Sequence, residues 1–281
     1  CVGAYIGCYF ANYLHTVIGS PLVVLILSML VGGAVAAVFG FIIGLPALRL
    51  KGDYLAIVTL AFGEIIRNVI NCLYISLDGQ RLHIAFNNPN VAGKLLVNGP
   101  AGATGVNKMA TFGMGFALTL FTLFVVLNLI DSRSGRAIMA IRDNRIAAES
   151  IGINVTYFKL AVFMLSAFFA GAAGTLYGHF FANVKAASFD YNMSIEILVI
   201  VVLGGMGSVP GSIIAAIVLQ LLPELMREFA DYRMLLYAIV LILVMLATND
   251  PRMREFFERL RPSNLVRKLA ARNKKEAQTD D

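Results

Sequence analysis

The sequence predicts an all-α fold, a polytopic bundle of transmembrane helices with about eight membrane segments. Of the 281 residues, 58% are hydrophobic and 14% are charged, whereas a soluble domain carries about a quarter charged residues. Most charges lie in two blocks, roughly 131–159 and 249–281, and the apolar stretches outside them approach the ~20 residues that cross a hydrocarbon core. The chain is therefore expected to fold in a lipid bilayer. Its net charge of +6 is attributed to basic residues beside the spans, and no nucleic-acid partner is expected.

The apolar runs divide the chain into membrane segments and one long loop. That loop, residues 76–109, is polar and rich in Gly, Pro and Asn. The sixth segment is expected to be broken or re-entrant, because 194–206 is short for a crossing and the glycines of 204–211 interrupt its helical pattern. The first segment opens at Cys1 and is expected to have lost its start. The expected segments are residues 1–14, 21–48, 54–75, 110–130, 159–181, 194–206, 212–226 and 233–248.

The distribution of Lys and Arg predicts the orientation in the membrane. Cytoplasmic loops carry an excess of these residues, so the charged loop 131–159 and the basic tail 251–281 are both assigned to the cytoplasm. An even number of segments, the fifth to the eighth, lies between them, which is consistent with that assignment. Arg49 and Lys51 fall on the same side. Residues 1–250 are expected to form the transmembrane domain, and the C-terminus is expected to be cytoplasmic.

A polar stripe on the third segment is the first candidate site. Glu64, Arg67, Asn68 and Asn71 follow the spacing i, i+3, i+4 and i+7, which places them on one face of a helix. A charged side chain in a bilayer costs about 2.5–3.5 kcal/mol even on lenient scales, so this face should not contact lipid. It is interpreted as the lining of a translocation path or as a subunit interface, and a structural polar seam near the headgroups remains the alternative.

The membrane segments also contain small residues, and single cysteine and histidine residues of the kinds that can bind metals. Gly204 and Gly205, at the break, are assigned to the same path or interface as the polar stripe. No metal or cofactor is expected, because the three cysteines form no CxxC pair and His179 has no partner at ligand spacing. Two runs of small residues should let helices pack closely. These runs are Gly32, Gly33, Ala36, Ala37 and Gly40, and Ala170, Gly171, Ala173 and Gly174.

The charged loop holds the second candidate site. Residues 134–152 read SGRAIMAIRDNRIAAESIG, too polar and too short to span a membrane. Asp143 or Asn144 can cap a short helix, and Gly152 can end it in a left-handed turn. Ile146, Ala147 and Ile151 would then form a small apolar face. The pattern suits a helix that docks in a groove of a soluble partner and equally an amphipathic linker on the headgroups.

Three stretches of the chain are distinctive: residues 44–67 (GLPALRLKGDYLAIVTLAFGEIIR), residues 135–144 (GRAIMAIRDN) with Ala147, Ala148 and Gly152, and residues 202–208 (VLGGMGS). Together they resemble the M-type permeases of branched-chain amino acid ABC transporters. The resemblance runs from residue 1 to about 250. Members of that family begin with more spans upstream. Ala101 stands where the family's Gly-Pro-Asn-Gly loop has Asn, and residues 76–97 look like an insertion.

The resemblance implies an inner-membrane importer subunit whose segment 134–152 is the helix that seats in the ATP-hydrolysing subunit. The implied partners are two ABC ATPase subunits, a sister permease of the H type and an extracytoplasmic substrate-binding protein. A bulky residue at Ala148 or Gly152 is then expected to uncouple ATP hydrolysis from uptake. The residues implied in this coupling are Gly135, Arg136, Arg142, Asp143, Asn144, Ala147, Ala148 and Gly152.

The residues themselves indicate a transport subunit and not an enzyme. Gly93-Lys94 is followed by Leu95 and lacks the glycine pattern of a phosphate-binding loop, so ATP hydrolysis is expected in a separate chain. No nucleophile–base or metal constellation is visible. Two alternatives stay open: an ABC permease for urea, amides or another small solute, and an ion-coupled secondary transporter, for which Glu64 and Glu196 are the available carboxylates.

Overall fold

The structure is a computed structural model that describes residues 1–15, 20–50, 52–78, 81–86, 94–103, 105–205 and 207–225. The chain divides into two compact units, residues 1–191 and 192–281. The last predicted segment, 233–248, and the basic tail 251–281 lie outside the described residues.

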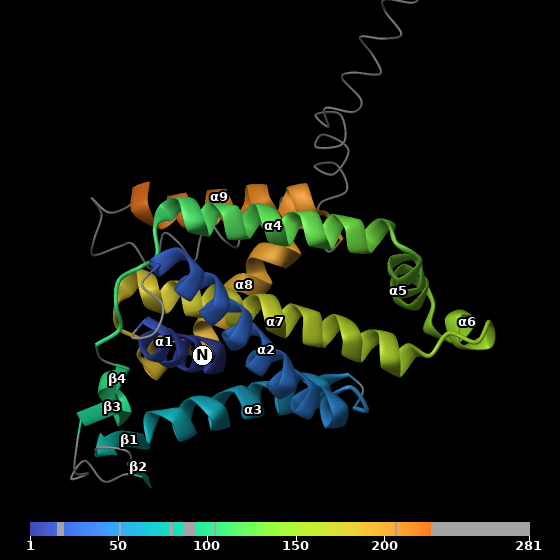
Figure 1. The fold of residues 1–281 in the computed structure, drawn as a ribbon. Helices are drawn as coiled ribbons and strands as arrows, with labels where there is room; N and C mark the ends of the chain where they lie inside the picture. Colours follow the sequence, from blue (N-terminus) through green and yellow to red (C-terminus); the bar gives the residue numbers. More distant parts are fainter. Residues whose placement is uncertain are drawn as a thin grey trace, which may run out of the picture. The chain divides into compact units, whose positions relative to one another are not determined.

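The described part consists mainly of α-helices, most of them apolar, which confirms the predicted fold class (Figure 1). Within it, five helical stretches are long and apolar enough to cross a membrane: Pro21–Ala47, Tyr54–Asn71, Phe112–Asp131, Val155–Phe181 and Ala186–Gly204. The helices are α1 (Val2–His15), α2 (Pro21–Ala47), α3 (Asp53–Asn71), α4 (Phe112–Asp131), α5 (Arg133–Asp143), α6 (Arg145–Ser150), α7 (Val155–Phe181), α8 (Tyr191–Gly204) and α9 (Val209–Leu225).

Local signals explain where two helices depart from the predicted bounds. Helix α7 begins at Val155, four residues before the predicted 159, because the Asn154 side chain caps it: Asn154 Oδ1 accepts a hydrogen bond from the Tyr157 amide at 3.1 Å. Helix α3 ends at Asn71, before the predicted 75, because a strand begins at Leu73. Both predicted helices exist, and only their ends were misplaced.

The prediction of a loop over 76–109 is wrong, because most of the described residues in this range form β-strands. Strands β1 (Leu73–Asp78), β2 (Arg81–Phe86), β3 (Lys94–Asn98) and β4 (Gly102–Ala103) form an antiparallel sheet in the order β2-β1-β3-β4. A short 3₁₀ turn, η1 (Gly99–Ala101), joins β3 to β4. Alternating residues such as those of LYISLD favour a strand, a signal that the Gly, Pro and Asn content of the region obscured.

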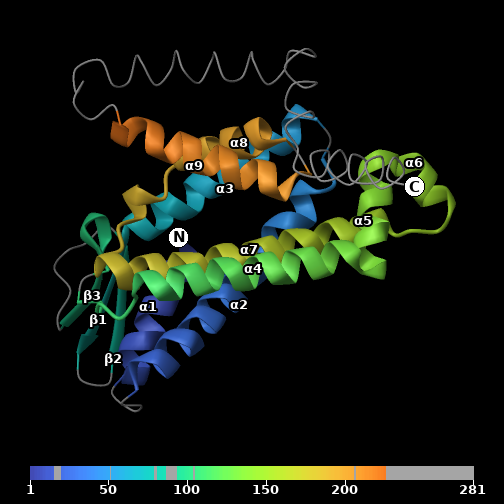
Figure 2. The same ribbon diagram turned by 90° about the horizontal axis from the view of Figure 1, so that it is seen from above.

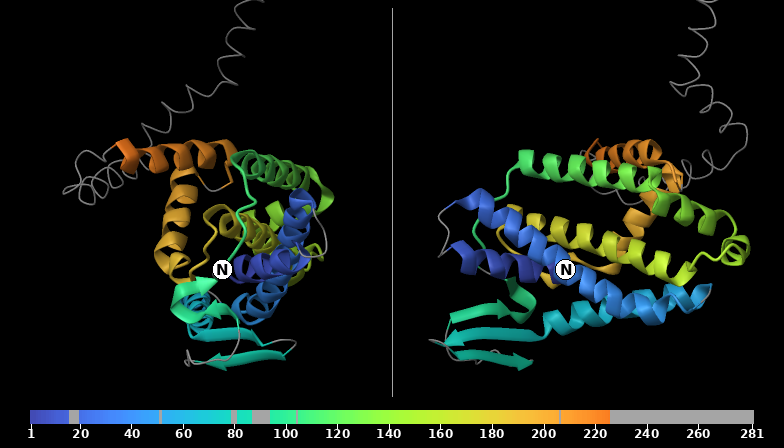
Figure 3. Two further views of the ribbon diagram at one scale, coloured as in Figure 1. Left: turned by 60° about the vertical axis from the view of Figure 1, so that its left-hand side comes forward. Right: turned by 45° about the vertical axis from the view of Figure 1, so that its right-hand side comes forward.

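The sheet is attached to the helices at one end of the first unit, here called the sheet end (Figure 3). Ala103 and Val184 exchange two backbone hydrogen bonds, of 2.8 and 3.4 Å, so β4 pairs with the chain just after α7. Val97, Ala103 and Val184 are buried in one cluster with Tyr5 and Cys8 of α1. The sheet is therefore tied to α1 and α7 by both backbone pairing and apolar packing.

The chain that leaves the sheet toward α4 is held by two side chains, of which one is half-buried and one is fully buried. Asn12 Nδ2 donates to the Gly105 carbonyl at 3.3 Å, and His179 Nδ1 lies 2.9 Å from the Asn107 carbonyl oxygen. His179 is fully buried in α7, and its Nε2 has no hydrogen-bond partner within the described part of the chain. His179 is thus a buried side chain that holds the chain at Asn107.

Helices α1, α2 and α7 form the core of the first unit through small residues. A Cβ added at Gly3 would overlap the backbone of Gly171, and one added at Gly7 would overlap Thr175, so α1 and α7 run in the same direction. The Thr175 hydroxyl lies 2.9 Å from the Gly3 carbonyl oxygen, to which it donates. Such backbone proximity is the packing mode expected where lipid supplies no hydrophobic drive.

Helix α2 completes this core in the opposite direction. A Cβ at Gly32 would overlap Thr175, and one at Gly40 would lie 2.8 Å from the Ala167 Cβ. The predicted role of the small-residue runs is therefore confirmed for α2 and for Gly171 and Gly174. Ala170 and Ala173 are exposed and lie outside this packed face.

The predicted break in the sixth segment is present in the second unit. Helix α8 ends at Gly204, Gly205 and Gly207 have positive φ of 87° and 93°, and α9 starts at Val209. The Ser208 hydroxyl accepts a 3.3 Å hydrogen bond from the Gly211 amide, which caps α9. A Cβ at Gly204 would overlap the Ser212 backbone, so Gly204 lets the two helices touch at the turn.

We expect Gly171→Ala to destabilise the protein and Gly63→Ala to be neutral or stabilising. At Gly171 the added Cβ would lie 2.8 Å from the Gly32 carbonyl oxygen, whereas nothing lies within 4 Å at Gly63. Overpacking of this kind costs about 1–3 kcal/mol, while Ala in an open helical position gains about 0.5–1 kcal/mol over Gly. Thermal unfolding of both variants in detergent measures the difference, and equal melting temperatures would contradict the packing described.

Candidate functional site

The charged segment 131–159 projects from the membrane helices as two short helices, α5 and α6, at the end of the first unit opposite the sheet (Figure 1 and Figure 2). Helix α4 leads into it and α7 leaves it. The α2–α3 connection lies at the same end, because Gly44, near the end of α2, packs against Leu160 and Phe163 near the start of α7. Arg49 therefore lies at the α5–α6 end, as predicted. Lys51 is outside the described residues.

A sharp turn separates α5 from α4. The Ser132 hydroxyl donates to the Leu129 carbonyl at 2.6 Å and accepts from the Gly135 amide at 3.0 Å, so one side chain ends α4 and begins α5. A Cβ at Gly135 would overlap the Leu129 and Ile130 carbonyl groups. Gly135 is thus required for the tight turn. The capping role of Ser132 was missed in the sequence, although Ser directly before a helix is the usual signal.

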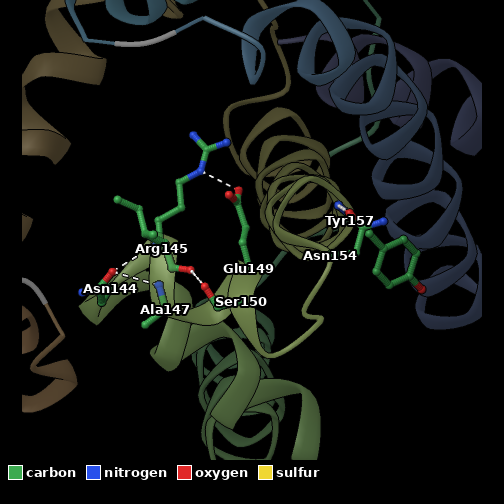
Figure 4. Close-up of polar contacts among 8 residues, drawn as sticks. Asn144, Arg145, Ala147, Glu149, Ser150, Asn154 and Tyr157 are labelled. Atoms are coloured by element: carbon green, nitrogen blue, oxygen red, sulfur yellow. Dashed lines mark hydrogen bonds and ion pairs between the residues drawn. The ribbon is translucent and has the colours of Figure 1, made fainter.

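Helix α6 has a defined cap at each end, and Figure 4 shows the first of them, at Asn144. Asn144 Oδ1 accepts hydrogen bonds from the Ile146 and Ala147 amides at 3.0 and 3.1 Å. At the other end the Gly152 amide donates to Glu149 O at 3.0 Å, and Ile153 donates to Ala148 O at 3.1 Å. This is a Schellman ending with Gly152 in the left-handed region, at φ 85°. Of the two predicted caps, Asn144 is the one used.

Ala148 connects α6 to its neighbours. It is only 2% exposed and lies in a buried cluster with Ile141 of α5 and Val155 of α7, against which Ile153 and Phe158 also pack. Since α6 is so short, this cluster determines how it is held against the two longer helices. Ala148 therefore cannot contact a partner protein unless α6 moves.

The predicted apolar face of α6 points away from the protein. Ile146 is 76% exposed and Ile151 74% exposed, and Ala147 is exposed between them. They lie outside the helices long enough to span a membrane, among charged neighbours. Isolated exposed apolar residues are ordinary. Ile146 in α6 and Ile151 directly after it are, however, held in position by the two caps and the buried cluster.

Four charged residues of this segment form two ion pairs with each other. Arg142 Nη2 lies 3.1 Å from Asp143 Oδ1, and Arg145 Nε lies 2.9 Å from Glu149 Oε1. Arg136 Nη1 donates to the Asp131 carbonyl at 3.2 Å. All are exposed, where such pairs contribute at most about 1 kcal/mol. These charged side chains can exchange partners at little energetic cost, so their present pairing does not prevent another molecule from contacting the segment.

On α3, the structure brings three of the four predicted stripe residues together. Arg67 Nε and Nη2 donate to Glu64 Oε2 at 3.0 and 2.7 Å. Asn68 Nδ2 donates to the Glu64 carbonyl at 2.9 Å. Asn71 lies on the same face without a described side-chain bond. No described side chain of α3 is fully buried. Gly204 and Gly205 belong to the second unit and form the α8–α9 turn.

Groupings that would hold a metal ion are not found in the part of the chain that the structure describes. The two regions present exposed apolar side chains at α6 and an ion pair on α3.

We expect Asn144→Ala to loosen α6, and Asn144→Asp to retain it. The first substitution removes both bonds to the Ile146 and Ala147 amides, a loss of about 1 kcal/mol. The second keeps an accepting oxygen and adds a charge favoured at a helix N-terminus. Hydrogen exchange of the amides of 146–150 in the full chain measures the effect. Equal exchange in the Ala and Asp variants would show that the cap is unimportant.

Comparison with known proteins identifies the family to which the chain is related. The family model described as the permease component of branched-chain amino acid transport systems matches residues 1–247. The high-affinity branched-chain amino acid transport system permease protein LivM of Salmonella typhimurium is 36% identical over 248 residues, which is 76% of this chain and 54% of LivM. The chain thus spans about half the length of the curated relatives it matches.

Two more distant relatives cover about half of the chain. The permease protein LivH of Escherichia coli is 29% identical over 140 residues, 49% of this chain and 43% of LivH. The ribose import permease protein RbsC of Haemophilus influenzae is 27% identical over 157 residues, 50% of this chain and 49% of RbsC. No solved structure matches. On the extent of the family match, this multi-pass membrane chain belongs to the branched-chain amino acid transport permease family.

Proposed function

We propose that the chain is a permease subunit of an ATP-binding-cassette importer that carries leucine, isoleucine and valine across the cell inner membrane. The observation that carries this proposal is the rigid α6 with Ile146 and Ile151 exposed outside the membrane helices. A protein that transports by itself has no need of such a tip, whereas a subunit driven by a separate ATPase needs a stiff element for the ATPase to bind.

The proposed partners are two ABC ATPase subunits at the α5–α6 end, an H-type sister permease and an extracytoplasmic substrate-binding protein. The permease relatives named LivM and LivH support a sister subunit. The α5–α6 end, with Arg49 and the arginines of 131–159, is assigned to the cytoplasm because basic loops stay there. The C-terminus is assigned to the same side.

The geometry suggests how displacement of α6 would reach the membrane helices. Ala148 packs against Val155, the first residue of α7, so a push on α6 passes directly into α7. Gly135 packs against the last carbonyls of α4, so the same push acts on α4. The proposed coupling residues thus divide by role. Gly135, Asn144, Ala148 and Gly152 hold the shape, whereas Arg136, Arg142, Asp143 and Ala147 are exposed for contact with the ATPase.

The alternatives differ in solute or in energy source. Because a ribose import permease matches about half of the chain, the scaffold alone does not determine the solute, and urea or an amide stays a rival. An ion-coupled transporter would need an unpaired intramembrane carboxylate. The carboxylate of Glu64 is already paired with Arg67, which leaves Glu196 as the carboxylate that this rival would have to use.

We expect cells that express the complete importer to take up leucine, and excess isoleucine or valine to compete with it. Urea and ribose should not compete. Uptake should stop when ATP is depleted while an ion gradient is maintained, because the proposed motor is an ATPase. Competition by urea, or uptake that survives ATP depletion, would replace the proposal with the corresponding alternative.

We expect the double substitution Ile146→Ser and Ile151→Ser to separate the chain from its ATPase subunits. Loss of two central apolar contacts costs about 2 kcal/mol or more, which corresponds to a weakening of about thirtyfold or more. Co-purification of the ATPase and leucine uptake are the measurements. Phe86→Ser, which removes an exposed aromatic residue at the sheet end, is the matched control and should keep the ATPase. Normal co-purification in the double variant would contradict the docking role.

A further inference from the structure

The face of α3 that carries the polar stripe is chemically divided along the helix. Ile57 and Leu60 are exposed apolar residues on the same face as Glu64, Arg67 and Asn71, at helical spacings of three, four and seven. One half of the face is therefore aliphatic and the other half is polar. The axial rise from Leu60 to Glu64 is about 6 Å, comparable with the length of a leucine molecule.

The Glu64–Arg67 pair leaves part of each group unused. All of the described bonds to the Glu64 carboxylate end on Oε2, and Arg67 uses Nε and Nη2. Among the described residues, Glu64 Oε1 and Arg67 Nη1 have no partner. The two side chains are 32% and 28% exposed. The pair thus offers one free carboxylate oxygen and one free guanidinium edge beside each other.

Contact with lipid would be energetically unfavourable for this face of α3. Free hydrogen-bonding positions on a charge pair are costly to expose to hydrocarbon. Helix α3 contacts α2 and the short turns η1 and η2 (Ala186–Ser188) within the first unit, and those contacts leave Glu64 and Arg67 partly exposed. A group that carries both charges and an apolar tail would satisfy every part of the face.

We propose that this face of α3 is a binding subsite for a zwitterionic aliphatic amino acid. The substrate ammonium would donate to Glu64 Oε1, its carboxylate would accept from Arg67 Nη1, and its side chain would lie on Leu60 and Ile57. Charge-assisted hydrogen bonds to both groups exclude solutes that lack either charge. This inference rests on the proposed function, because it names the part of the permease that recognises the solute during passage.

The test is protection of a cysteine placed in the subsite. Leu60→Cys is made in a chain whose own cysteines, Cys1, Cys8 and Cys72, are replaced, and is assembled with its partners in permeabilised membranes. A water-soluble, positively charged methanethiosulfonate reagent then modifies it. Leucine should slow the modification. The analogues 4-methylpentanoate, which lacks the ammonium, and 3-methylbutylamine, which lacks the carboxylate, should protect only at concentrations about tenfold or more higher.

Two controls isolate the charge pair. Val69→Cys places the thiol at an exposed position away from the stripe on α3 and should show no protection by leucine. Glu64→Gln with Arg67→Gln removes both charges together, so no unpaired charge remains in the membrane. This variant should remain in the membrane while leucine protection at Leu60→Cys is lost.

Leucine uptake is measured in parallel in sealed vesicles by the cysteine-free complex with Leu60 in place, because uptake requires a closed compartment. Uptake by this complex without any protection at Leu60→Cys overturns the subsite and leaves the proposed function standing, whereas absence of uptake overturns both. Failure of the reagent to reach Leu60→Cys places that face against lipid or protein and overturns the subsite. Equal protection by leucine and both analogues overturns it as well.

Discussion

The close contact of backbones among α1, α2 and α7 is the constraint on which the first unit depends. In a bilayer, burying apolar side chains between helices gains little, because lipid tails are equally apolar. Gly3, Gly7, Gly32 and Gly171 let the helices approach until the Thr175 hydroxyl reaches the Gly3 carbonyl of another helix. Side chains of ordinary size at these positions would separate α7 from both neighbours. That separation would remove the rigid support of everything attached to α7.

Helix α7 carries both attachments. Its first residue, Val155, belongs to the buried cluster that holds α6. At its other end, Val184, just after the helix, pairs with β4, and His179 holds the chain at Asn107. With 27 residues it is about 40 Å long, enough to pass through the hydrocarbon region with a tilt. An ATPase acting on α6 would therefore act, through one continuous helix, on the opposite end of the unit. Helix α4 also leads to this end of the unit, but it has no fully buried residue and is less tightly packed than α7.

The polar stripe of α3 shows how a charged pair is retained in an apolar helix. Glu64 and Arg67 are three residues apart and neutralise each other, and the Asn68 side chain donates to the Glu64 carbonyl one turn earlier. The polar part of the helix therefore carries no net charge. The sequence predicted that these residues share a face, because helical spacing alone determines it. Their bonding to one carboxylate oxygen depends on rotamers that spacing does not specify. Because of these rotamers, Glu64 Oε1 and Arg67 Nη1 have no partner among the described residues.

Features encoded in short stretches were determined by the sequence: the apolar helices, the break after Gly204, the cap at Asn144 and the left-handed end at Gly152. Each depends on a few neighbouring residues and on the period of one helix. Only the tertiary structure decided that Ala148 is buried while Ile146 and Ile151 are exposed, and that Ala103 pairs with Val184 across 81 residues of chain. Such contacts depend on which surfaces meet. A sheet among membrane helices was missed for the same reason, since a strand is stable only when its partner strand is present.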